Sequence, residues 1–190
     1  WHYKRYQMPI LALSVPLAGW LLILLTRYRR GQLLSLVLAG IGLLLSIYTN
    51  QMFIALYGDN VLVTTNLQFA MAKWIDANLP AEARVGVFDV GIVRYVSKRY
   101  TYDVVGLTTP QVAGAMRQGP GAVYDTMAGF PQQPDYFALY PTPRHPSTIY
   151  LMRTRAWGEQ LANFETPDVP NTTSAGNSQI VARADWTDLE

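Results

Sequence analysis

The sequence predicts a membrane α-helical hairpin followed by a small α/β extracytoplasmic domain, and three observations lead to this fold class. Two uncharged stretches of 21 and 28 residues, 6–26 and 31–58, lie near the N-terminus. The rest of the chain alternates apolar segments of helical and of strand period, separated by Gly, Pro and polar residues. Charge divides in the same way, because residues 1–57 carry five Lys or Arg and no acid, whereas residues 58–190 carry ten basic and thirteen acidic residues.

The uncharged stretches predict two transmembrane helices, at about residues 8–26 and 33–57. A helix needs roughly 20 apolar residues to cross the bilayer core, and both stretches meet this requirement. They also contain Gly and Pro, which membrane helices tolerate better than soluble helices do. We therefore expect an integral protein of the cell (plasma) membrane, with the lipid bilayer as its first partner.

A short basic loop separates the two predicted helices and sets the expected orientation. It contains Arg27, Arg29 and Arg30, and short loops rich in Lys and Arg tend to stay in the cytoplasm. The hairpin turn is then cytoplasmic, and the domain formed by residues 58–190 is extracytoplasmic.

The domain is expected to begin with a helix. Five apolar residues share one helical face: Leu67, Ala70, Met71, Trp74 and Ile75. Thr65 or Asn66 is placed to cap the start of this helix, and Pro80 marks its end.

Short strands alternate with helical segments in the remainder, which predicts a small α/β layer. Helical segments are expected at residues 91–97 and, weakly, at 109–129. A polar loop near residues 165–178 is expected to be mobile. The predicted strands cover residues 85–88, 100–107, 134–141, 148–157 and 178–186.

Three carboxylates stand beside predicted strands and are candidate site residues: Asp89, Asp103 and Asp135. Asp89 follows a strand and precedes a helix, which is where α/β folds place ligand-binding groups. Together the three carboxylates are able to supply an acid, a base or metal ligands for a hydrolase-like site. The plain alternative is that each one caps a helix or stabilises a turn, and nothing in their spacing shows that they converge.

Several kinds of site are not supported by the sequence. The chain has no cysteine, which excludes disulfides and thiolate chemistry, and its two histidines are too few for a histidine-based metal centre. The mildly acidic domain offers no clustered basic face for nucleic acid. Because no phosphate-binding, metalloprotease or serine-hydrolase motif is present either, we assign no catalytic residue, metal ligand or cofactor.

Arg5 and Tyr6 directly precede the first predicted membrane helix. This position places a guanidinium and a phenol at the depth of the lipid headgroups, where they are able to bind a lipid phosphate. The alternative is ordinary anchoring of basic and aromatic side chains at the membrane interface.

The same region begins a resemblance to a known family. Residues Arg5 to Pro9 read RYQMP, with Arg-Tyr and a Pro three residues later at the start of a membrane helix. Together with the domain, this pattern resembles the C-terminal region of bacterial polytopic glycosyltransferases of the GT-C superfamily, similar to the protein mannosyltransferase and lipid A aminoarabinose transferase group. The resemblance covers about residues 2–141. In the domain it is carried by Trp74, Pro80, Asp89, Gly91, Tyr95, Asp103, Gly106, Leu107, Pro134, Asp135 and Tyr136.

The resemblance implies a function that the residues alone do not give. Members of this group move a sugar from a polyprenyl-phosphate carrier to an extracytoplasmic acceptor, and their catalytic carboxylate lies in an early external loop to which no residue here corresponds. It therefore implies a non-catalytic part of such an enzyme, with further N-terminal transmembrane helices of the same protein as partners and Arg5 and Tyr6 as contacts for the carrier phosphate. The alternative is a membrane-tethered binding or assembly module without catalytic activity.

Overall fold

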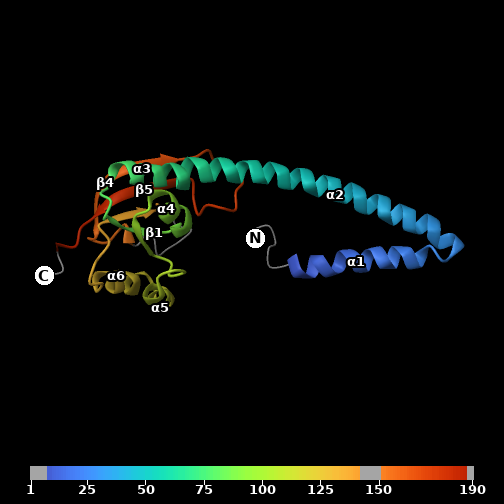
Figure 1. Ribbon diagram of the computed structural model, residues 1–190, viewed down its shortest axis with the longest axis horizontal. Coiled ribbons are helices and arrows are strands. Elements are labelled where there is room, and N and C mark those ends of the chain that lie inside the picture. Colours follow the sequence, from blue (N-terminus) through green and yellow to red (C-terminus); the bar gives the residue numbers. More distant parts are fainter. Residues whose placement is uncertain (1–7, 142–150, 188–190) are drawn as a thin grey trace. The chain divides into compact units, whose positions relative to one another are not determined.

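The computed structural model describes residues 8–141 and 151–187 and divides the chain into two compact units, Trp1–Asn60 and Val61–Glu190. Arg5 and Tyr6 lie outside the described residues. Figure 1 shows the helical first unit in blue and the mixed α/β second unit in green to red.

The first unit consists of two apolar helices, α1 (Met8–Leu25) and the larger part of α2 (Arg29–Thr64). The Ser35 hydroxyl donates to the Leu22 carbonyl across the two helices at 3.1 Å. The loop is shorter than predicted, because Arg29 already belongs to α2. Most large apolar side chains of these helices are exposed.

One helix in the described part of the chain is long and apolar enough to cross a membrane, and it runs from Arg29 to Asn78. Its most apolar window is only 11% buried by protein. The apolar part of α1 is shorter, covering Ala12–Leu25.

The second helix does not end where the sequence predicted. It continues from α2 through one wide turn of π-helix, η2 (Thr65–Phe69), into α3 (Ala70–Asn78). The expected cap at Thr65 or Asn66 is therefore wrong, because both residues lie inside a continuous helix whose backbone N–H groups are already bonded. The apolar face itself is confirmed, since Leu67, Met71 and Ile75 are fully buried.

A mixed five-stranded sheet forms the centre of the second unit, in the order β2-β1-β3-β5-β4. The first three strands in this order are parallel, and β5 and β4 are antiparallel to their neighbours. The strands are β1 (Arg84–Val87), β2 (Tyr100–Asp103), β3 (Tyr136–Leu139), β4 (Trp157–Glu165) and β5 (Ser178–Ala184).

Helices cover both faces of this sheet, and a separate apolar core fills each side. The remaining helices are α4 (Val90–Ser97), α5 (Pro110–Gln118) and α6 (Pro120–Ala128). On one face α3 and α4 pack against Val85, Val87 and Ala138. On the other face α5 and α6 pack against Phe137 and Leu139 (Figure 1). The predicted small α/β domain is thereby confirmed, as burial on both faces is typical of parallel strands.

Two strand predictions need correction. The strand expected at residues 100–107 ends at Asp103, because the Asp103 carboxylate folds the chain into a turn. The strand expected at 148–157 is wrong in its described part, because residues 152–156 form turns and a bend and β4 begins only at Trp157. The sequence concealed β4 because register shifts interrupt its pairing with β5 and blur the alternation of apolar residues.

Candidate functional site

A cleft of about 390 Å³ opens at the carboxyl end of β1. The chain leaves β1 for β2 on one side and later returns to β3 on the other side. Strand order reverses direction at such a point, and α/β proteins bind ligands in the crevice that this creates. Gln68, Asp89 and Thr173 are polar residues that line the cleft, and Leu107 contributes an exposed apolar side chain.

Asp89 is the half-buried acidic side chain of this cleft, and several donors converge on its Oδ2 atom. The Nε2 atom of Gln179 lies 3.0 Å from Oδ2, and the Nε2 atom of Gln68 lies 3.3 Å from it. The Tyr140 hydroxyl also donates to Oδ2. Although Asp89 occupies the N-cap position of α4, it makes no side-chain capping bond to that helix, so its role is not that of a helix cap.

The π-helical turn explains how Gln68 reaches the cleft. A wide turn shifts the helical register, and π turns often occur at functional sites. Leu67 and Gln68 are consecutive, yet both are buried. The Gln68 amide nitrogen also donates to the Tyr140 hydroxyl at 3.0 Å and to the Thr173 carbonyl at 3.1 Å. Gln68 thus connects the helix to β3 and to the loop before β5.

The Asp89 network also determines the state of the Tyr140 hydroxyl. Burial, together with the neighbouring Asp89 charge, raises the pKa of Tyr140 above its usual value. Tyr140 therefore keeps its proton and acts as a donor to Asp89. Because the Oδ2 atom already accepts bonds from three side chains, it is poorly placed to take a proton from a substrate.

Two buried amide oxygens close to this network are unpaired. The Oε1 atoms of Gln68 and Gln179 have no hydrogen-bond partner among the described residues. An unsatisfied buried acceptor costs about 1–3 kcal/mol. Gln68 also lines the cleft, so a donor from a ligand or a water molecule at this place adds stability.

Asp103 has the structural role that was the alternative prediction. It is fully buried at the end of β2. Its carboxylate accepts hydrogen bonds from the backbone N–H groups of Val105, Gly106 and Thr108 at 2.8–3.0 Å. These bonds form the turn that leads to α5.

Asp135 lies at the opposite end of the parallel strands, beside their amino ends. It precedes β3, while Asp89 and Asp103 stand at the carboxyl ends of strands parallel to β3. Its carboxylate binds the Arg84 guanidinium through two bonds of 2.5 and 2.9 Å and also accepts the Arg84 backbone N–H at 2.9 Å. Burial opposes the charge, but the bonds from Arg84 prevail and lower the pKa of Asp135.

The structure therefore does not bring the three predicted carboxylates together. No group of three or more possible metal-ligating side chains occurs among the described residues. Sequence reasoning found Asp89 but missed the three residues that hold it: Gln68, Tyr140 and Gln179. Only weak signals marked them, because Gln68 stood next to an apolar helical face and the other two lay in or beside strands.

Residues 55–186 match DUF8728, a domain of unknown function. The chain belongs to this family. The DUF8728 match starts inside α2, covers all five strands completely and includes every residue of the Asp89 network. No curated protein and no solved structure matches the chain.

Proposed function

We propose that this chain is the non-catalytic, membrane-anchored part of an integral membrane glycosyltransferase, and that its DUF8728 domain acts by binding. The observation that carries the anchoring is the continuous helix Arg29–Asn78. Its first part exposes apolar side chains such as Leu36, Leu43 and Leu44, whereas its last part lies in the core of the α/β unit.

In this proposal α1 and the first part of α2 form a membrane hairpin. The large exposed apolar surface is costly in water and favourable in lipid. The hairpin turn, with Arg27, Arg29 and Arg30, lies in the cytoplasm. The α/β unit is then extracytoplasmic.

The chemistry of the Asp89 cleft supports binding rather than catalysis. Donors from Gln68, Gln179 and Tyr140 hold the carboxylate. A general base must reach the proton that it accepts, and the Oδ2 atom of Asp89 is already occupied by these three donors. The other two candidate carboxylates have structural roles: Asp103 stabilises a turn, and Asp135 forms an ion pair with Arg84.

The sugar-transfer part of the proposal rests on the family resemblance. If it holds, the carrier is a polyprenyl-phosphate sugar, and Arg5 and Tyr6 contact its phosphate at the start of the first membrane helix. Other transmembrane helices of the same protein supply the catalytic carboxylate. The α/β unit then faces the side of the membrane on which transfer takes place.

The test uses the full-length protein in membrane vesicles, with a polyprenyl-phosphate-linked radioactive sugar as the donor. Vesicles from cells that carry the gene are expected to transfer label, and vesicles from a deletion strain are not. Asp89→Asn is expected to leave kcat within about threefold and to act mainly on KM, because the residue binds and does not react.

Two outcomes would overturn the proposal. Equal transfer by both kinds of vesicle would favour the alternative, a membrane-tethered binding or assembly module without catalytic activity. A fall in kcat of about a thousandfold for Asp89→Asn, with KM and thermal stability unchanged, would make Asp89 catalytic.

A further inference from the structure

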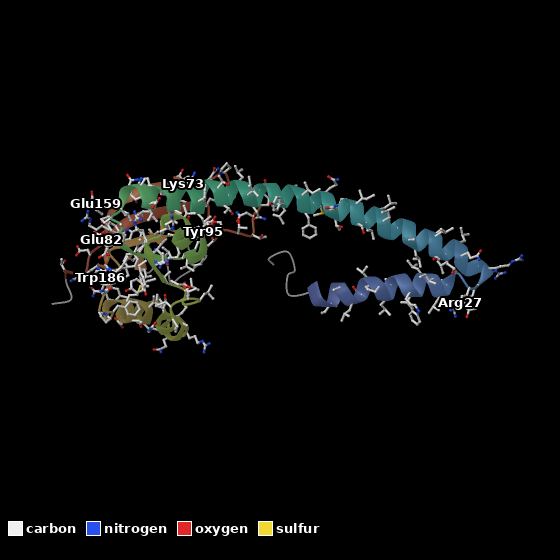
Figure 2. All side chains as sticks on the ribbon, in the orientation of Figure 1. Arg27, Lys73, Glu82, Tyr95, Glu159 and Trp186 are labelled. Atoms are coloured by element: carbon white, nitrogen blue, oxygen red, sulfur yellow. The ribbon has the colours of Figure 1, made fainter. Side chains whose placement is uncertain are left out.

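A second cleft, with a volume of about 820 Å³, lies at the amino ends of β1 and β3, opposite to the end at which Asp89 lies. We call it the Arg84 groove, after the residue at the start of β1 that lines it together with Asp135. Figure 2 shows Glu82 and Trp186, two more of its lining residues, at one end of the α/β unit, and Tyr95 at the other end. The groove and the Asp89 cleft have no lining residue in common, so they are separate sites.

Several residues of the Arg84 groove are held in place before any ligand binds. Pro80, Pro131 and Pro134 line it, and proline restricts the backbone. The bidentate bonds between Arg84 and Asp135 fix two polar side chains. The Trp186 indole N–H donates to the Pro134 carbonyl at 2.8 Å, which fixes the ring. A preformed site loses little conformational entropy on binding.

The charges of the Arg84 groove balance. Its lining includes two basic residues, Arg84 and Arg183, and two acidic residues, Glu82 and Asp135. A site for a phosphate or a nucleotide needs an excess of positive charge. The balanced lining instead fits a neutral ligand.

The polar groups of the groove offer both donors and acceptors on planar side chains. Arg84 and Asp135 bond to each other, and the Gln133 amide donates to the Ala128 carbonyl. The groups that face a ligand are therefore the Arg183 guanidinium, which donates, the Glu82 carboxylate, which accepts, and the Gln132 amide, which does both. A hydroxyl group also donates and accepts, so neighbouring hydroxyls of one molecule match such a lining. Trp186 is half-buried and adds aromatic surface for the C–H groups of a ring, whereas the Arg183 guanidinium already lies over the Tyr136 ring, 5.9 Å from its centroid.

From these features we infer that the Arg84 groove binds a neutral carbohydrate. Its volume lies within the range of small-molecule pockets, about 300–1,000 Å³. Glu82 and Arg183 are the exposed charged groups of the groove, and in this proposal they contact ligand hydroxyls. The inference goes beyond the proposed function and holds whether or not the protein transfers sugar.

The experiment applies the full chain, in a detergent without a sugar headgroup, to an array of neutral and phosphorylated glycans. Glu82→Gln and Arg183→Gln are the test variants, because exposed side chains can be changed without unfolding the domain. Glu159→Gln on β4 and Arg117→Gln on α5 are matched controls, since both residues are exposed and do not line the groove.

The inference predicts binding to at least one neutral glycan, weakened about tenfold by each groove variant and unchanged by each control. A titration by calorimetry with the bound glycan gives these factors. Three results would overturn it: no binding to any neutral glycan, binding that groove variants and controls affect equally, or binding to phosphorylated glycans alone that free inorganic phosphate displaces.

Discussion

Replacing Tyr140 by Phe isolates one hydroxyl in the Asp89 network. The hydroxyl donates to the Asp89 carboxylate and accepts from the Gln68 amide nitrogen at 3.0 Å. Phe keeps the ring, which is fully buried and makes an edge contact with Phe88 at a centroid distance of 5.3 Å. The change therefore removes hydrogen bonds without opening a large cavity.

The cost of Tyr140→Phe follows from the charge of its partner. Hydrogen bonds to charged groups contribute about 1.5–3 kcal/mol to stability. For a unit of this size, such a loss lowers the unfolding temperature by about 5–10 °C. Tyr124→Phe is a matched control, because Tyr124 is half-buried on α6 and its hydroxyl makes no hydrogen bond among the described residues. We expect a loss below about 0.5 kcal/mol for this control.

The assay follows the thermal unfolding of the full chain in detergent by tryptophan fluorescence. Trp74 and Trp157 pack against the two cores of the α/β unit and report on its unfolding. If Tyr140→Phe unfolds at the same temperature as Tyr124→Phe, the hydroxyl does not bind the carboxylate and the description of the site is wrong.

Three further predictions concern the framework of the domain. Asp135→Asn should be less stable than wild type at pH 6, and the difference should shrink as pH falls below 3.8. The pKa of Asp135 is lower in the folded than in the unfolded chain, so its carboxylate stabilises the fold above the unfolded-state pKa and this stability is lost in acid. Melting curves at pH 6 and pH 3 check this. Gly106→Ala should lower the free energy of unfolding by more than about 2 kcal/mol, since a Cβ there meets the Ala113 nitrogen at 2.4 Å. Gly119→Ala should cost only backbone strain, because its Cβ meets no atom within 4 Å. Equal urea midpoints for the two variants would contradict this. Asp103→Ala should fail to fold or lose at least about 3 kcal/mol of unfolding free energy, because it leaves buried N–H groups without an acceptor. Asp125→Ala, on the exposed face of α6, should be near neutral in the same urea titration.

Much of the architecture could be predicted because it depends on local patterns. The face of Leu67, Met71 and Ile75 was visible as helical spacing, and β1 and β3 were visible as short apolar runs. The edge strand β4 was missed because Gly158 and irregular pairing break its alternation. The π turn was not predicted because the contacts that accompany it are tertiary. Gln68, within this turn, meets Tyr140 and Asp89, which lie far away in the sequence.

The candidate site was predictable only in part. Asp89 was found from its position after β1, a rule that needs only strand order. Its partner Gln179 lies 90 positions later in the chain, and the pairing of β5 with β3 decides that they meet. The separation of Asp135 from Asp89 likewise depends on strand direction, which spacing in the sequence does not encode.

The most direct test of the account is the membrane topology of the chain in intact cells. This chain has no cysteine, so single cysteines introduced in it at Arg27 and at Glu159, both exposed (Figure 2), can be labelled with a maleimide that does not cross membranes, with the protein without these substitutions as the blank. We predict that Glu159→Cys is labelled in intact cells and that Arg27→Cys is labelled only after lysis, with both proteins in the membrane fraction. Labelling of Arg27→Cys but not Glu159→Cys in intact cells, or recovery of the chain in the soluble fraction, would contradict the account.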